Sequence, residues 1–237
     1  EEAESGRVTL ARLLAGSEGT LAVVTAVTVS LEPVPETKAA ALLPYDDLMD
    51  ALHDVAPILE HDPCAVEVLD DVLLDLARDT EEFADVVAML PEGTGAVLLV
   101  EFYADSDAEG RELVADLVAD RAPGTETAAD PPGDVSTGAP VRAGAALTAH
   151  DAARRERFWK LRKSGLPILL GRTTDEKHIS FIEDTAIPPA ELPAFVEGFE
   201  AILEEHDTFA SYYAHAGPGV LHIRPLVNTK TVEGVDT

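Results

Sequence analysis

The segment GAVLLVEFYA, about residues 95–104, restricts the possible folds most, because it is mostly apolar and predicts a strong strand. Ser106 follows closely and predicts the N-cap of a helix that continues to about Ala122. A second strand is predicted at KAAALLPY. The main part of the chain is therefore expected to alternate strands with helices.

Strand and helix patterns continue in mixed order along the chain. A helix is expected over 46–60, where Leu48, Leu52, Val55 and Leu59 recur at helical spacing. Further helices are predicted at 70–78, at EEFADVVAML, over 149–164 and from Pro188 to about Glu205, and further strands at AVEVLDD, 177–185, 208–215 and 219–226. The Pro- and Gly-rich residues 123–148 are expected to form a loop or extended crossover, with room for one short strand. This order predicts an α+β fold, a largely antiparallel sheet with helices packed on one face.

The N-terminal residues have the pattern of the end of another unit. LARLL predicts a short helix, and the Gly-Ser-Glu-Gly turn that follows leads into a Val- and Thr-rich strand. Pro33 and Pro35 then interrupt that strand.

The acidic composition restricts the class of partner. Asp and Glu number 45 against 17 Lys and Arg, which gives a formal net charge of −28. The acidic residues are spread along the chain, and the 46% apolar content argues against disorder. We therefore expect a folded protein with an acidic, halophilic type of surface that works in concentrated salt. Binding to nucleic acid or to anionic lipid is disfavoured, because both require a positive surface.

Cysteine content and hydropathy bear on the compartment. Cys64 is the single cysteine, which excludes an internal disulfide and fits a reducing cytoplasm. No apolar run reaches the ~18 residues expected of a membrane helix.

Two short segments carry residues suited to binding. In AGSEGTLAVVT, Gly16 and Gly19 permit a tight turn, which could hold a phosphate or a polar ring edge or could simply cap the strand that follows. In AHAGPGVLH, His215 and His222 flank a glycine turn, and by themselves they fit either metal ligands or structural histidines.

Four segments together resemble one family. GSEGTLAVVT is similar to GSEGTLGIVT of FAD-linked oxidoreductases of the vanillyl-alcohol oxidase type. RFWKLRKSG is similar to that family's W-x-x-R helix, HISFIEDTAIPPAEL to its EDVAVP strand and helix, and AHAGPGVLHIRP to its GHxGDGNxH block. The blocks follow the family order over nearly the whole chain. The branch they resemble comprises D-lactate dehydrogenases, glycolate oxidase FAD subunits and D-2-hydroxyglutarate dehydrogenases.

The resemblance implies roles for individual residues. Arg162 and Lys177 would bind the substrate carboxylate, and Arg224 would be either a second anion contact or part of a structural ion pair. His215 and His222 would act in catalysis, by binding zinc or manganese or by contacting the substrate hydroxyl. The residues implied to contact FAD are Gly16, Ser17, Glu18, Gly19, Thr20, Val24 and Thr25.

The resemblance also implies a domain organisation. Residues 1–35 would be the C-terminal end of an FAD-binding domain, and 36–237 a substrate or cap domain that is incomplete at its C-terminus. Pro218 and Val220 stand where the family has Asp and Asn, and the family's later glutamate ligand is absent from the sequence. With these differences, the segment resembles a sub-branch of the family in which the flavin part is fused to an iron–sulfur domain.

The activity implied is oxidation of a D-2-hydroxy acid, such as lactate, glycolate or 2-hydroxyglutarate, by hydride transfer to flavin. An iron–sulfur domain or subunit would accept the electrons, and the family context allows a homodimer in the cytoplasm or at the inner face of the membrane. The alternative is a non-catalytic acidic assembly domain that keeps the fold without binding metal or substrate.

Other polar residues have less specific interpretations. Glu183 and Asp184 are adjacent in a predicted strand and are expected to point to opposite faces. His178 is expected near the substrate or exposed to solvent. Of Tyr212 and Tyr213, one ring is expected to pack and the other to be exposed.

Overall fold

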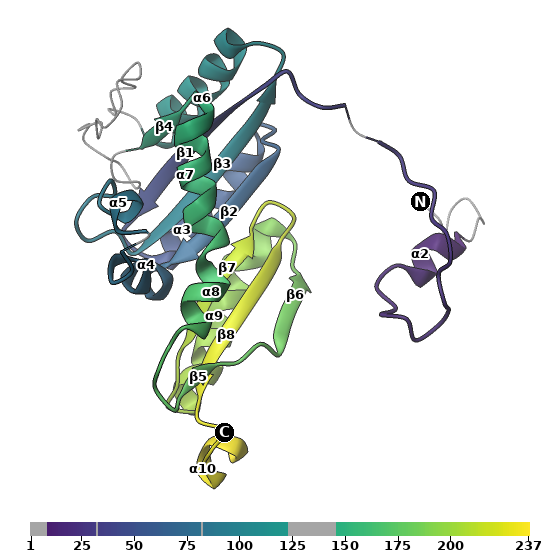
Figure 1. The fold of residues 1–237 in the computed structure, drawn as a ribbon, viewed down its shortest axis with the longest axis vertical. Helices are drawn as coiled ribbons and strands as arrows, with labels where there is room; N and C mark the ends of the chain where they lie inside the picture. The colour runs from purple at the N-terminus through teal and green to yellow at the C-terminus, as the bar shows by residue number, and fades with distance from the viewer. Residues whose placement is uncertain (1–8, 32, 82, 123–145) are drawn as a thin grey trace. The chain divides into compact units, whose positions relative to one another are not determined.

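The computed structural model describes residues 9–31, 33–81, 83–122 and 146–237 (Figure 1). The chain divides into two compact units, Glu1–Val34 and Pro35–Thr237, which are described separately. Most of the predicted crossover, residues 123–145, lies outside the described residues.

The N-terminal unit contains one helix and one tight turn. Helix α2 spans Leu10–Leu14, and the turn that follows uses positive φ angles at Gly16 (78°), Glu18 (49°) and Gly19 (76°). The prediction of a Val- and Thr-rich strand is wrong, because residues 21–31 pair with none of the described strands. A strand needs a hydrogen-bonded neighbour, and Val23 in this segment is 88% exposed.

The larger unit is built on one eight-stranded sheet in the order β4-β1-β3-β2-β7-β8-β5, with β6 also paired to β8. All seven strand pairs are antiparallel, which confirms the predicted fold class. The strands are β1 Thr37–Tyr45, β2 Ala65–Asp70, β3 Ala96–Ala104, β4 Leu147–Ala149, β5 Lys177–His178, β6 Ile182–Ala186, β7 Ala210–His215 and β8 Val220–Val227.

Five of the described helices, α3, α4, α6, α7 and α10, begin at a capping side chain that the sequence supplies. For α3, the carboxylate of Asp47 accepts a hydrogen bond from the backbone amide of Asp50 at 2.8 Å. For α6, the hydroxyl of Ser106 accepts one from the backbone amide of Glu109 at 3.2 Å. The helices are α3 Leu48–Leu59, α4 Asp71–Arg78, α5 Ala84–Val87, α6 Asp107–Arg121, α7 Ala152–Lys163, α8 Gly165–Leu170, the 3₁₀ helix η1 Pro189–Glu191, α9 Leu192–Glu205 and α10 Val232–Asp236. Helices α8 and α10 were not expected from the sequence.

Helices cover both faces of the sheet rather than one (Figure 1). One apolar cluster packs Ala41 and Leu43 of β1 against α3, α6 and α9. The other packs Ala40 and Leu42 of the same strand against α4, α5, α7 and α8. The expectation of helices on one face is therefore wrong, because β1 is apolar at successive positions and both of its faces need cover.

Candidate active site

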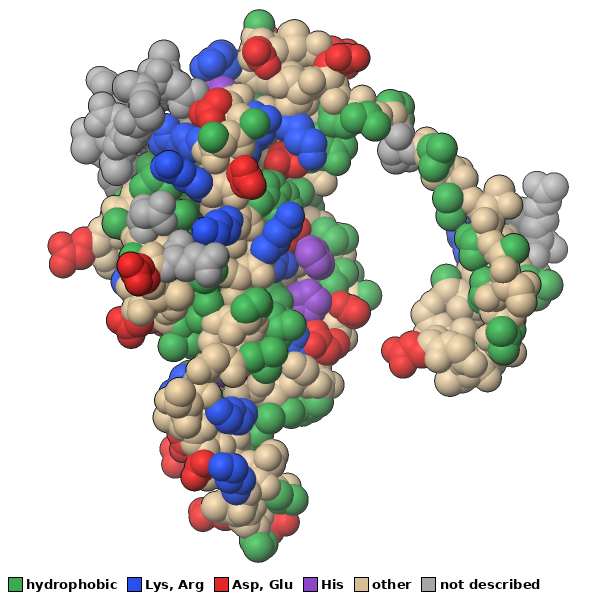
Figure 2. Space-filling view, viewed as in Figure 1, with side chains coloured by type: hydrophobic (Ala, Val, Ile, Leu, Met, Phe, Trp, Pro, Cys, Tyr) green, Lys and Arg blue, Asp and Glu red, His purple; other side chains and the backbone are tan. Residues whose placement is uncertain are grey.

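The hairpin of β7 and β8 places the predicted histidines on one face of the sheet. Tyr213 lies opposite His222 and Ser211 opposite Arg224, so these four side chains share a face with His215 at the end of β7. The glycine turn between the strands brings the two imidazole rings together, with centroids 5.4 Å apart. On the face shown in Figure 2, histidines lie beside basic and acidic side chains, and basic side chains gather over α7.

Glu67 joins His215 to Arg162. It lies on β2 directly opposite His215, and its side chain is only 7% exposed. Its two carboxylate oxygens lie 2.8 and 2.9 Å from Nδ1 of His215, and Oε2 also accepts from Nε of Arg162 at 2.7 Å. The buried carboxylate thus pairs with a guanidinium from α7 and with an imidazole from β7.

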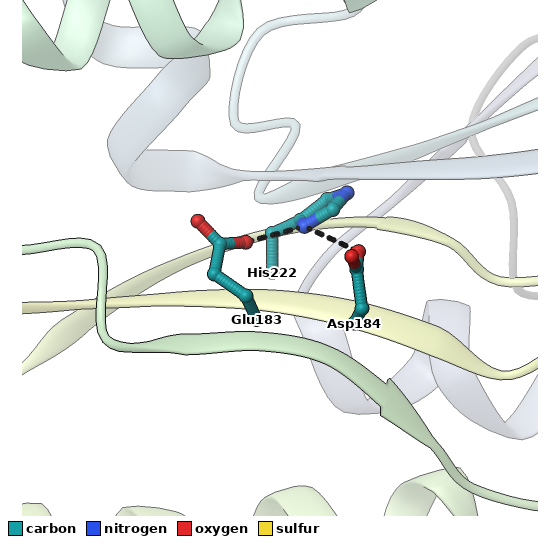
Figure 3. Close-up of side chains that lie close together, drawn as sticks. All are labelled: Glu183, Asp184 and His222. Carbon is teal, nitrogen blue, oxygen red and sulfur yellow. Dashed lines mark hydrogen bonds and ion pairs between the residues drawn. The ribbon is translucent and has the colours of Figure 1, made fainter. Parts of the chain in front are cut away.

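Glu183 has the corresponding relation to His222 (Figure 3). Its Oε2 lies 2.7 Å from Nδ1 of His222, and Oδ1 of Asp184 lies 3.6 Å from the same nitrogen. The register of β6 shifts between Ile182 and Thr185, and Asp184 has a φ of 50°. This bulge turns both carboxylates toward one ring, so the expectation that they point to opposite faces is wrong.

Arg224 completes this second group. Its guanidinium forms an ion pair with Glu183 and donates to the Tyr213 hydroxyl at 3.1 Å from Nε and 2.6 Å from Nη2. Burial raises the pKa of Glu183, but hydrogen bonds from Arg224 and His222 outweigh it, and the net direction is downward. The carboxylate of Glu183 is therefore held in its ionised form.

Tyr213 lies at the centre of the cluster. The guanidinium carbons of Arg162 and Arg224 each lie 5.3 Å from its ring centroid, and the ring of His222 lies at 4.9 Å. Tyr213 and Tyr212 are both buried, one in each apolar cluster, so the expectation that one ring is exposed is wrong. Both faces of β7 are covered, which leaves neither ring in solvent.

Several polar atoms of the cluster have no hydrogen-bond partner among the described residues. Neither His215 nor His222 makes a hydrogen bond through Nε2 to the described part of the chain. Nη2 of Arg162 is buried and also has no hydrogen-bond partner among those residues. The side chain of His215 is 49% exposed and that of His222 is 15% exposed, so the imidazoles border solvent.

Glu183, Asp184 and His222 also lie close enough together to hold a cation. The 2.7 Å between Oε2 of Glu183 and Nδ1 of His222 is a hydrogen-bond distance, and Arg224 already balances the charge of Glu183. This arrangement is better described as an ion-pair cluster that fixes His222.

Lys177 and His178 do not join the cluster. Lys177 lies opposite Val227, which places it on the other face of β8 from His222, and its ammonium donates to the carbonyl of Arg172. His178 is buried, and its Nδ1 lies 2.8 Å from the carbonyl oxygen of Arg224, so the expectation that it is exposed to solvent is wrong. Burial lowers the pKa of His178, which favours a neutral structural imidazole.

The predicted flavin contacts lie in the N-terminal unit. Gly16, Ser17, Glu18 and Gly19 form the turn, and the hydroxyl of Thr20 closes it by donating to the Ser17 carbonyl at 2.7 Å. Val24 and Thr25 lie in the extended segment that follows and are exposed.

The sequence matches a known family. Residues 34–237 match the model of FAD linked oxidases, C-terminal domain. The chain belongs to this family. The fold also resembles that of alkyldihydroxyacetonephosphate synthase, with a TM-score of 0.55 at 13% identity over 93% of this chain and 42% of the other. At this identity the likeness shows the fold alone.

Curated relatives of this FAD-linked oxidase domain include three kinds of enzyme. D-2-hydroxyglutarate dehydrogenase from Pseudomonas putida is 28% identical over 96% of this chain and 22% of its own length. Glycolate oxidase subunit GlcD from Escherichia coli is 30% identical over 92% of this chain and 38% of its own length. D-lactate dehydrogenase from Anaerostipes hadrus is 28% identical over 94% of this chain and 43% of its own length. The chain thus spans about a fifth to two fifths of the length of these relatives.

Sequence reasoning missed Glu67 as a site residue. Its one signal is a charged side chain with apolar neighbours on both sides in AVEVL, the start of the predicted strand. A buried carboxylate needs partners, but the partners here lie 95 and 148 residues away along the chain, where no local pattern reveals them.

Proposed function

We propose that this chain provides the substrate side of the active site in an FAD-dependent enzyme that oxidises a D-2-hydroxy acid. The observation that carries the proposal is the convergence of Arg162, His215, His222 and Arg224 around Tyr213 on one face of the sheet. Guanidinium groups suit a carboxylate, and imidazoles suit a hydroxyl or a metal bound to it. Lactate, glycolate and 2-hydroxyglutarate all carry both groups on adjacent carbons.

Arg162 is the carboxylate ligand in this proposal. Glu67 occupies its Nε, so the terminal Nη atoms are left for the substrate, and Nη2 lacks a partner in the described residues. Arg224 has a structural role instead, because Tyr213 and Glu183 already engage its nitrogens. Lys177 is left out, because it lies on the opposite face of β8.

A divalent ion, zinc or manganese, fits His215 and His222. In both imidazoles Nδ1 lies beside a carboxylate, and Nε2 has no hydrogen-bond partner among the described residues. This arrangement is usual for metal-binding histidines. When bound, the metal would polarise the substrate hydroxyl and favour loss of its proton. His215 and His222 would hold the hydroxyl side of the substrate with Arg162 on the carboxylate side.

The N-terminal residues would contribute to FAD binding, and residues 1–35 would be the end of the FAD-binding domain. The turn suits this role because Gly16 and Gly19 have open space around them and the side chains of Glu18 and Thr20 are exposed. FAD would accept the hydride from C2 of the acid. An iron–sulfur domain or subunit as electron acceptor, a homodimer and a cytoplasmic location belong to the same proposal.

An acidic surface adapted to concentrated salt is also proposed, on the net charge of −28. In the part of the chain that the structure describes, no helix combines the length and hydropathy needed to cross a bilayer.

Activity of the complete protein tests the proposal. D-lactate, glycolate and D-2-hydroxyglutarate would each be assayed with a dye acceptor, and Arg162→Ala and His215→Ala are expected to abolish turnover. Arg157→Ala, an exposed arginine on the same helix, serves as the matched control and is expected to retain it. Full activity in both site variants would refute the assignment.

A second function, a non-catalytic assembly domain, is favoured by one observation. Glu67 and Glu183 already neutralise both buried arginines, so the cluster could be a closed ion-pair network. Metal titration of the complete protein with flavin bound separates the two functions. Binding of zinc or manganese that requires His215 and His222 supports the enzyme, whereas no binding together with no turnover supports the assembly domain.

A further inference from the structure

The cluster contains two groups of the same composition. His215, Glu67 and Arg162 form one, and His222, Glu183 and Arg224 form the other. In each group a glutamate is shared between a guanidinium and Nδ1 of an imidazole. The repeat is built from four separate strands and one helix, because β2, β6, β7 and β8 each contribute to it together with α7.

We propose that Glu67 and Glu183 are positioning residues that fix both histidines with the proton on Nδ1, so that Nε2 of each carries its lone pair toward the ligand. A neutral imidazole has one N–H, and a carboxylate paired with a guanidinium can only accept a hydrogen bond. The proton must therefore lie on the nitrogen that faces the carboxylate. The significance for catalysis rests on the proposed function, but the tautomer does not.

The geometry of each glutamate supports this role. Both oxygens of Glu67 lie within 2.9 Å of the same nitrogen of His215, which restricts rotation of the ring. Figure 3 shows the carboxylate of Glu183 beside Nδ1 of His222, with the other ring nitrogen directed away from it. Two lone pairs fixed in this way on neighbouring rings make a ready pair of ligands for one metal ion or one hydroxyl group.

The two glutamates differ in how firmly they are held. Glu67 is buried in the middle of the sheet, whereas the side chain of Glu183 is 37% exposed on a bulged edge strand. Glu67 also sets which edge of Arg162 faces the substrate, because it occupies Nε. Loss of the Glu67 carboxylate is therefore expected to have the larger effect.

Nitrogen chemical shifts of the imidazoles test the proposal directly. In the 15N-labelled chain at alkaline pH, where imidazoles are neutral, long-range 1H–15N spectra distinguish a protonated ring nitrogen from one with a lone pair. His215 and His222 are both expected to show the proton on Nδ1. A proton on Nε2 of either ring in the unmodified chain would overturn the inference for that ring, whether or not any variant folds.

Amide substitutions add the causal test. Glu67→Gln is expected to move His215 toward a mixture of tautomers and to leave the tautomer of His222 unchanged. Glu183→Gln is expected to do the same to His222 and to leave His215 unchanged. In both cases the reason is that an amide can donate a hydrogen bond as well as accept one. Glu101→Gln is the matched control, since Glu101 is also a buried sheet glutamate but bonds Trp159 and Lys38 instead. An unchanged His215 tautomer in a folded Glu67→Gln variant would contradict the proposal.

Kinetics of the complete protein separate positioning from general structural support. Glu67→Gln is expected to lower kcat by about 10- to 100-fold with a smaller change in KM, as for other residues that orient metal ligands. Glu101→Gln is expected to change neither. If the complete protein oxidises no 2-hydroxy acid, the proposed function fails while the tautomer result still decides the present inference.

Discussion

At the scale of single residues, Asp70 is a buried acid that accepts three hydrogen bonds. It is 1% exposed and accepts hydrogen bonds from the amide of Leu73 at 3.0 Å, the hydroxyl of Ser211 at 3.0 Å and the amide of Tyr212 at 2.5 Å. It therefore caps α4 and joins β2 to β7. Burial raises its pKa to about 7, against the opposing effect of these donors.

This shift predicts a pH dependence of stability. Because the folded pKa of Asp70 lies above the unfolded value of ~3.9, the folded state binds the proton more tightly, and its stabilising effect is complete below pH ~4. The free energy of unfolding should fall by up to about 4 kcal/mol as the pH rises from ~4 to ~7, at 1.36 kcal/mol per pKa unit. Urea unfolding between pH 4 and 8 in high salt measures it.

Asp70→Asn supplies the comparison, because it cannot ionise. Its unfolding free energy should be lower than that of the unmodified chain at pH 4 but should change less with pH. Equal pH slopes for the two proteins would show that Asp70 does not titrate in this range.

A second residue-scale prediction concerns two carboxylates that share Arg121. Asp54 is 1% exposed, lies 2.5 Å from Nη2 of Arg121 and accepts from the Tyr45 hydroxyl at 2.8 Å. Asp120 lies 3.5 Å from the same guanidinium, but its side chain is 54% exposed. Asp54→Asn should cost about 3 kcal/mol, because it breaks a buried pair, and Asp120→Asn less than about 1 kcal/mol. Chemical denaturation compares them, and equal costs would contradict the difference in burial.

At the scale of elements, the β7–β8 turn depends on close backbone packing. Gly219 has a φ of 76°, and a Cβ there would lie 1.6 Å from the carbonyl oxygen of Ile187. Its own carbonyl accepts from the amide of Ile187 at 2.9 Å. The turn thus anchors the end of β6, the strand whose bulge directs Glu183 to His222.

Gly219→Ala should therefore destabilise the chain by more than about 2 kcal/mol, through both the strained φ and the contact with Ile187. Gly198→Ala is the matched control, because Gly198 lies in α9 with open space around it. That change should stabilise the chain by up to ~1 kcal/mol. Thermal melts of both variants measure the contrast, and a neutral Gly219→Ala would mean that the turn can rearrange.

At the scale of the whole molecule, the net charge of −28 dominates. Repulsion among the acidic side chains opposes the compact state, and added salt screens it. Raising KCl from 0.1 to 2 M should increase Tm by roughly 4–8 °C, which corresponds to a gain of about 2 kcal/mol for a chain of this size. The gain should shrink near pH 4, where many carboxylates are protonated, and an equal gain at both pH values would exclude charge screening as its cause.

The sequence by itself determined most elements of the main unit. Apolar runs specified β1, β2 and β3, and helical spacing with an Asp or Ser cap specified α3 and α6. The order of predicted strands and helices along the chain was sufficient to predict the antiparallel α+β class. Short motifs were sufficient to select Arg162, His215 and His222 as candidate site residues. These features depend on neighbours within a few residues, and such local interactions leave a readable pattern.

Only the tertiary structure decided which side chains meet. It paired Glu67 with His215 and Arg162, turned Asp184 toward His222 through a bulge, and set Lys177 on the opposite face of β8 from His222. Each of these depends on strand register, where a shift of one residue moves a side chain to the other face. Register is fixed by packing between segments far apart in the chain, and local sequence does not encode it.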